Sequence, residues 1–224
     1  MTDFIVSIAN IFIDDIVTWR EEIHLSVTGG AGLHALSGCR VWNEQLGIVA
    51  SVGKDVRPLL PELLKMGIDT QGLVFDQEKT NRAWQIFQPG DLRVEVMRDP
   101  AIPLRQAIPD FKRLPEQYLK AAGYHILWNG EDRQLFDLLE KIRWENPTCA
   151  IVLEPSPNDA GKPLDRFKGI FPLIDGFSPS LSEAQSILKI NLPEEIIRSF
   201  LRLGCRAVAL RLGRSTSLES DWIR

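Results

Sequence analysis

Short apolar runs alternate with helical periodicity in the first part of the chain. Apolar and β-branched residues predict strands over residues 4–9, 12–17, 23–27 and 46–52. Apolar spacing predicts a helix from Leu33 to about Gln45, and a second helix over 59–66 that ends at Gly67. Strands that alternate with helices are typical of an α/β fold with a central, mostly parallel sheet flanked by helices.

Residues 72–98 follow a different pattern. Short strands are predicted over 72–75, 82–88 and 92–98, and apolar and polar residues partly alternate in the last two. Pro89-Gly90-Asp91 between them is a hairpin signal. We therefore expect a half-exposed antiparallel sheet here, in the manner of a flap.

A second series of strands and helices follows a proline-containing stretch at 99–115. Strands are predicted over 124–128, 149–153, 173–177 and 206–212. Helices are predicted over 131–144, 182–188 and 193–203, the first of them amphipathic. Residues 214–224 add one polar, strand-like piece and no closing helix.

Composition narrows the functional classes. The 224 residues are 44% hydrophobic and 25% charged, which fits one substantial core. A net charge of −4 gives no electrostatic case for nucleic acid or an anionic membrane as partner. The three cysteines and three histidines are scattered without a metal-binding spacing, and no signal or membrane-spanning run is present. We expect a cytoplasmic protein with free thiols.

A glycine-rich turn is the strongest local signal. Gly30-x-Gly32-x-x-Ala35 follows a predicted strand, opens a predicted helix and formally fits the dinucleotide-binding fingerprint. The next strand ends in Ser51-Val52-Gly53-Lys54 and lacks the acidic residue that would hold a ribose. A Rossmann oxidoreductase is therefore the least favoured hypothesis, and the alternative for the glycines is a tight packing turn between strand and helix.

Five motifs in order carry a family resemblance. They are Asp15-Ile16-Val17, Gly29-Gly30-Ala31-Gly32, the block from Leu46-Gly47 to Val52-Gly53-Lys54-Asp55, Gly67-Ile68-Asp69-Thr70 and Lys79-Thr80-Asn81-Arg82-Ala83. In order and spacing this set resembles the ribokinase-like (PfkB-type) carbohydrate kinases. Fainter similarities continue at 177–184 and 204–213.

The resemblance implies one ribokinase-like domain over residues 1–224, with lid segments at about 12–27 and 72–98 that form a small β lid. It implies an ATP-dependent kinase, with Mg²⁺, that transfers the γ-phosphate to a hydroxyl of a sugar or nucleoside. It also implies a possible homodimer through the lid.

Site residues follow from the same resemblance. Asp15, Gly29, Gly30 and His34 are the expected substrate contacts, and Glu183 is expected to support a metal–phosphate arrangement. Other roles stay open: Asp14 could exchange roles with Asp15, and His34 could be an ordinary helical histidine. Glu183 could be a helix N-terminal acid, and Asp55 is best read as a turn or capping residue.

Three departures from the family pattern affect activity. His34 and Ser180 each stand where the family has asparagine, and no Gly-x-Gly-Asp occurs in the sequence, so the anion hole and catalytic base are missing. Asp221 has no glycine turn before it and does not inherit the catalytic role. We expect a ribokinase-like fold that lacks its C-terminal part and has no catalytic residue of its own. The alternative is a non-catalytic sugar-binding or interaction protein.

Overall fold

The computed structural model describes residues 3–90, 92–102, 104, 107, 109–128, 131–156 and 161–213. Residues 214–224, with the expected tail strand and Asp221, lie outside them, as does Asp91 of the hairpin signal. The chain divides into two compact units, Met1–His125 and Ile126–Arg224, where the sequence predicts a single domain.

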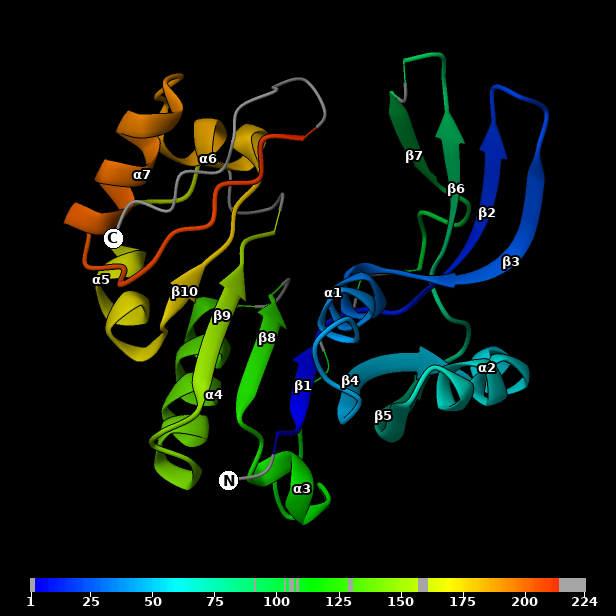
Figure 1. Ribbon diagram of the computed structural model, residues 1–224, viewed down its shortest axis with the longest axis horizontal. Coiled ribbons are helices and arrows are strands. Elements are labelled where there is room, and N and C mark those ends of the chain that lie inside the picture. The colour runs from blue at the N-terminus through cyan, green and yellow to red at the C-terminus, as the bar shows by residue number, and fades with distance from the viewer. Residues whose placement is uncertain are drawn as a thin grey trace. The chain divides into compact units, whose positions relative to one another are not determined.

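A parallel sheet forms the centre of the first unit. β1 (Ile5–Ile8) and β5 (Ile68–Gln77) each pair in parallel with β4 (Leu46–Gly53). β8 (Gly123–Leu127), which begins in this unit, is the next strand after β1 in the strand order of the sheet. All eight residues of β4 are buried, as expected of an almost uninterrupted apolar run. The expected α/β class with a mostly parallel sheet is confirmed (Figure 1).

Helices cover this sheet. α1 (Ala31–Cys39) contributes the buried Leu33 and Leu36, and α2 (Leu60–Lys65) contributes Leu63, to a cluster around Ile48 and Val52. A 3₁₀ helix, η1 (Lys54–Leu59), precedes α2, and a short helix, α3 (Glu116–Leu119), precedes β8. α1 ends at Cys39 and not near Gln45; residues 40–42 form a turn in which Val41 and Trp42 are exposed and bury no apolar face that would prolong the helix.

A second, smaller sheet stands in the same unit (Figure 1). Its order is β3 (Ile23–Gly29), β2 (Phe12–Thr18), β6 (Arg82–Phe87) and β7 (Arg93–Met97). The β6–β7 hairpin is antiparallel as predicted, whereas β2 and β6 run in parallel, so the sheet is mixed. The second lid segment needs correction at its start: β5 pairs with β4, with two shifts of register, as far as Gln77, and the first strand of the small sheet after it begins at Arg82.

Strand register gives the small sheet two unlike faces. Residues that pair directly across strands point to the same face. Ile16, Gln85 and Glu95 are paired along one line, beside the line of Asp14, Ala83 and Met97. The opposite face carries mostly apolar side chains: Val17, Ile23, Ile86 and Val94 along one line, and Asp15, Trp84 and Val96 along the next.

The second unit packs helices around short parallel strands. β9 (Ala150–Glu154) pairs with β10 (Gly176–Phe177). α4 (Asp132–Glu145) buries Leu135, Leu138, Leu139 and Ile142, the apolar stripe predicted for it. The other helices are α5 (Arg166–Ile170), η3 (Phe171–Leu173), α6 (Leu181–Leu188) and α7 (Pro193–Arg202).

Four buried phenylalanines fill the core of this unit. Phe167 and Phe171 stack with centroids 4.8 Å apart, and Phe177 and Phe200 meet at 5.0 Å, edge to face. Three of the rings come from the consecutive elements α5, η3 and β10, and Phe200 comes from α7. Aromatic packing therefore ties α5, β10 and α7 together.

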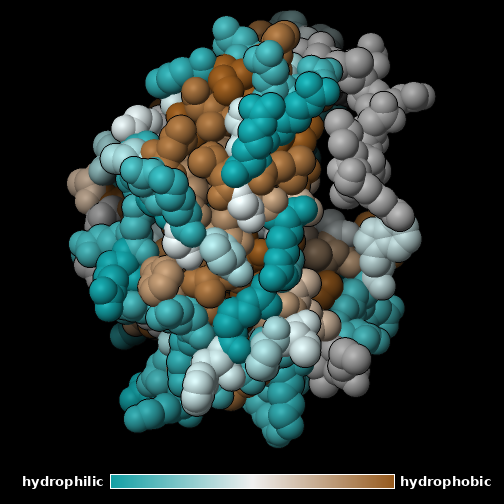
Figure 2. Space-filling view, turned by 90° about the vertical axis from the view of Figure 1, so that its left-hand side faces the viewer, coloured by the Kyte–Doolittle hydropathy of each residue, from teal (hydrophilic) through white to brown (hydrophobic). Residues whose placement is uncertain are grey.

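The predicted strand over 206–212 forms only two isolated bridges, Phe177 with Val208 and Ser180 with Arg211. Hydrogen bonds still join this segment to residues 177–181; Ala209 N, for example, donates to Phe177 O at 2.9 Å. Apolar surface is visible on the side of the molecule drawn in Figure 2, and Trp144, Val152 and Leu192 are exposed in this unit. No helix in the described ranges is long and apolar enough to span a membrane.

Candidate functional site

The glycine turn joins β3 to α1 in the first unit. Gly30 has φ +93°, and a Cβ there would lie 2.8 Å from Asn10 O and 2.9 Å from Phe12 N, so only glycine fits. Asn10 takes up two helix N–H groups: its Oδ1 accepts from Ala31 N at 3.0 Å, and its backbone oxygen accepts from Gly32 N at 3.2 Å. Because Asn10 already accepts from these two N–H groups, they are not free to bind a phosphate, as the N–H groups of a dinucleotide-binding turn must be.

Asp14 lies against this turn. A Cβ added to Gly29 would come within 1.9 Å of Asp14 Oδ2, so the absence of a side chain at Gly29 is what admits the carboxylate. Asp14 is only 4% exposed, and burial raises the pKa of its carboxyl group. The hydrogen bond from Gln85 and the charges of His34 and Arg93 oppose that shift, whereas Glu95 adds to it.

Asp15 lies on the opposite face of the small sheet. Its Oδ1 accepts from Ser26 N at 2.8 Å, and its Oδ2 is paired with Arg98. The Arg98 guanidinium also lies over the Trp84 ring, 5.2 Å from the centroid. Successive residues of a strand point to opposite faces, so Asp14 and Asp15 cannot both approach Gly29. Of the two aspartates, Asp14 is the one beside the glycine turn.

Gln85 and Glu95 extend the polar group around Asp14, and sequence analysis missed both. Gln85 Nε2 donates to Asp14 Oδ1 at 3.3 Å and to Glu95 Oε1 at 3.2 Å. Gln85 is buried, and its Oε1 has no partner among the described residues. The available signal was the alternation in 82–88, which places a glutamine between the apolar Trp84 and Ile86.

His34 stands in the first turn of α1, where its backbone N–H donates to Gly30 O at 3.1 Å. Its side chain is exposed and acts electrostatically on Asp14. Asp14, Gly29, Gly30 and His34 therefore form one group, with hydrogen-bond acceptors and a histidine at its surface. Such a group suits a ligand that offers several hydroxyl groups.

Asp55 has a structural role, but it does not cap a helix as the sequence suggested; it joins η1 to residues 80–82. Its Oδ1 accepts from Thr80 N and Thr80 Oγ1, each at 2.8 Å, and Oδ2 pairs with Arg82 at 3.3 Å. Thr80 Oγ1 also accepts from Gly53 N at 3.0 Å. Two of the sequence motifs, 46–55 and 79–83, are thus joined by one hydrogen-bond network.

Glu183 belongs to the second unit and caps α6. Its Oε2 accepts from Ser180 N at 2.7 Å, while Ser180 Oγ accepts from Glu183 N at 3.3 Å, which completes a capping box. Glu183 also pairs with Arg211 at 3.4 Å. The helix-terminal role is therefore present. In the described ranges, no group of three or more His, Cys, Asp or Glu residues is arranged to hold a metal ion.

Comparison with solved structures identifies the fold. The PfkB protein from Polaromonas sp. JS666 is 18% identical, with a TM-score of 0.65 over 95% of this chain and 77% of that one. A fructokinase from Halothermothrix orenii is 18% identical, with a TM-score of 0.66 over 94% and 80%.

A third match is a ribokinase from Cryptococcus neoformans var. grubii serotype A, solved in complex with ADP. It is 14% identical, with a TM-score of 0.67 over 95% of this chain and 73% of that one. No family model and no curated protein matches the sequence. The chain thus spans 73 to 80% of the length of these three structures. It has the fold of the ribokinase-like (PfkB-type) carbohydrate kinases.

Proposed function

We propose that this protein binds a sugar or nucleoside at the face of the small sheet that carries Asp14, Gln85 and Glu95. One observation carries the proposal: the buried Asp14 carboxylate lies against the backbone of Gly29, in reach of the charge of His34. A carboxylate accepts hydroxyl protons, and a bare glycine backbone allows a ligand close approach. Gly29, Gly30 and His34 keep the substrate roles implied by the sequence. We assign the direct contact to Asp14 and none to Asp15, whose carboxylate is held by Ser26 and Arg98 on the other face.

The family activity, ATP-dependent phosphorylation of a sugar hydroxyl, is the wider context of this proposal. A ribokinase neighbour bound to ADP supports nucleotide binding by resemblance, with Mg²⁺ as its expected companion. The sequence has no Gly-x-Gly-Asp to supply an anion hole and a base. We therefore assign acceptor binding to these 224 residues, and no phosphoryl transfer by them alone. Glu183 would support a metal–phosphate group only if it left its cap.

A non-catalytic sugar-binding protein is the second candidate. The observation that favours it is the capping box, in which Glu183 already serves Ser180 and Arg211.

The three free cysteines fit a reducing cytoplasm. The apolar face of the small sheet supports a homodimer as the expected assembly.

Calorimetric titration of the full chain tests acceptor binding, with D-ribose, D-fructose and adenosine as probes. At least one probe should bind saturably, and Asp14→Asn should weaken it by about tenfold or more, because a hydrogen bond to a charged acceptor is lost. Asp15→Asn is the matched control, since it removes the same charge from the next residue. We expect it to change affinity much less.

Two outcomes would overturn the assignment. One is the absence of saturable binding by any probe; the other is equal loss in Asp14→Asn and in Glu62→Gln, an exposed carboxylate on α2. A phosphotransfer assay with ATP and Mg²⁺ tests the remaining claim, because turnover by the 224 residues would overturn the assignment of acceptor binding without phosphoryl transfer. Tight NADH binding would instead favour a Rossmann-type nucleotide site.

A further inference from the structure

A cavity of about 430 Å³ lies in the first unit, away from the face that carries Asp14. Lys79, Arg82 and Arg98 supply three cations to its wall, and Asp55 and Asp99 supply two carboxylates. Thr80 and Ile102 complete the lining. Its volume suits a small organic molecule.

Arg82 is held in place at this wall. Its Nη2 donates to Asp55 Oδ2 at 3.3 Å, and Asp55 is itself fixed by the backbone and side chain of Thr80. The arginine side chain remains 30% exposed. One long bond uses a single N–H group, so other donors of the planar guanidinium stay available to a ligand.

Arg98 is held just as firmly. It pairs with the buried Asp15 on one side and lies over the Trp84 ring on the other. A guanidinium fixed by an ion pair and an aromatic face has little rotamer freedom left to lose when a ligand binds. Arg82 and Arg98 thus present two ordered forks to the same cavity.

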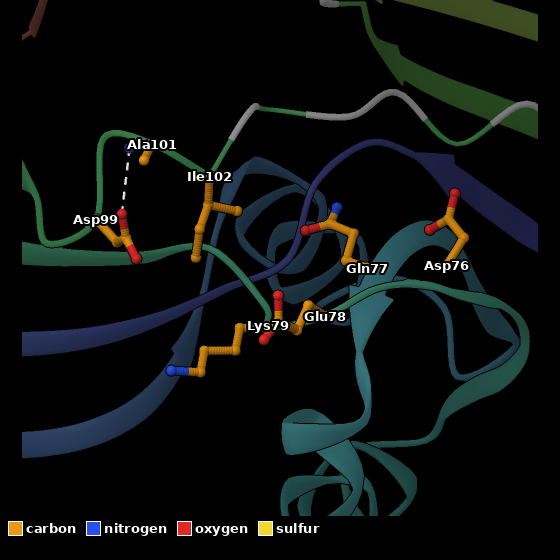
Figure 3. A pocket seen from close by; sticks show the side chains of 7 residues that line it. All are labelled: Asp76, Gln77, Glu78, Lys79, Asp99, Ala101 and Ile102. Carbon is orange, nitrogen blue, oxygen red and sulfur yellow. Dashed lines mark hydrogen bonds between the residues drawn. The ribbon is translucent and has the colours of Figure 1, made fainter.

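Lys79 adds a third, unpaired cation. It is exposed, and no ion pair holds it in the described part of the chain. It also borders an adjoining cavity of about 280 Å³, where Figure 3 shows its side chain extending away from Asp76 and Gln77. Asp99, shared by both cavities, already accepts a hydrogen bond from Ala101 N at 3.2 Å. The cationic end is therefore the part of the wall with unused donors.

We propose that this cavity binds a small molecule through a phosphate or carboxylate group held between Lys79, Arg82 and Arg98. Guanidinium forks match the paired oxygens of both groups, and lysine supplies a mobile point charge. The rest of the ligand would extend toward the carboxylates of Asp76 and Glu78, which line the adjoining cavity and favour hydroxyl donors. This site is independent of the acceptor site and does not rest on kinase activity.

Inorganic phosphate and malonate are the probes. Each is titrated at constant ionic strength into the isotope-labelled full chain, and amide resonances are followed by NMR. Saturable shifts should centre on Lys79, Thr80 and Arg82. Lys79→Gln should weaken the affinity by about tenfold, as loss of a charge-assisted contact does, and Lys65→Gln on α2 should leave it unchanged. Arg98→Lys keeps the charge but removes the fork, and should also weaken binding.

The outcomes divide clearly. Saturation by phosphate alone supports a phosphate ester as ligand, by malonate alone a carboxylate, and by both the shared oxyanion chemistry. The proposal is overturned if neither anion saturates, or if binding persists undiminished in both Lys79→Gln and Arg98→Lys. Because Lys79 is exposed, its substitution leaves the fold intact and the result interpretable.

Discussion

Two consecutive aspartates on β2 have opposite surroundings, and this difference decides the candidate site. Asp14 is buried beside Gly29 with a raised pKa, whereas Asp15 is paired with Arg98. A carboxyl group with a raised pKa binds protons more tightly in the folded state, so its ionisation lowers stability as the pH rises above its ordinary value of 3.8. Asp14→Asn should therefore stabilise the protein at pH 7, by on the order of 1 kcal/mol, while weakening acceptor binding. Thermal melts of both proteins from pH 3 to 8 check this; a variant less stable than wild type at pH 7 would contradict it.

Asp55 should show the reverse dependence. Burial raises the pKa of this carboxyl group, but hydrogen bonds from Thr80 and Arg82 together outweigh burial, and the net pKa is lowered. Its contribution is therefore present above the ordinary value of 3.8 and is lost as the pH falls through the folded pKa. Asp55→Asn should cost about 1–2 kcal/mol near pH 7 and almost nothing in strong acid. Denaturant titrations at several pH values measure the difference, with Asp110→Asn, an exposed carboxylate, as control. A loss that does not shrink in acid would exclude this account.

At the scale of elements, the residues that begin α6 have two proposed roles: a structural one, in capping the helix, and a chemical one, in supporting a metal and phosphate. Ser180 and Glu183 form a capping box, so Ser180→Ala should cost about 1 kcal/mol of unfolding free energy. Ser186→Ala, later in the same helix, is the control and should cost less, as measured by denaturant titration. ADP–Mg²⁺ titration of Glu183→Gln tests the other reading. An affinity unchanged from wild type would leave the cap as the only role of Glu183.

Elements dominated by local signals were predictable, and those decided by distant partners were not. The apolar stripe of α4 and the apolar run of β4 foretold their burial, and the glycine turn foretold the start of α1. The strand expected at 206–212 depends on pairing with a neighbour, and it forms only isolated bridges. Register with β4 likewise placed β5 in the main sheet. Similarly, the pattern at 12–17 could not tell which aspartate faces Gly29, because that choice depends on how β2 pairs with β3 and β6.

For the molecule as a whole, the exposed apolar face of the small sheet argues for self-association. Val94 and Val96 on β7 are 42% and 44% exposed, and Ile23 on β3 is 62% exposed. Apolar side chains that share one face form a patch of the kind that proteins cover with a partner. We expect a concentration-dependent dimer in analytical ultracentrifugation, and Val96→Lys should weaken it by about tenfold or more because a charge would be buried. Val74→Lys, on the main-sheet strand β5 with 36% exposure, should leave the dimer intact. A chain that sediments as a monomer at high concentration and binds no hydrophobic dye would refute this assembly, whereas equal loss in both variants would place the contact elsewhere.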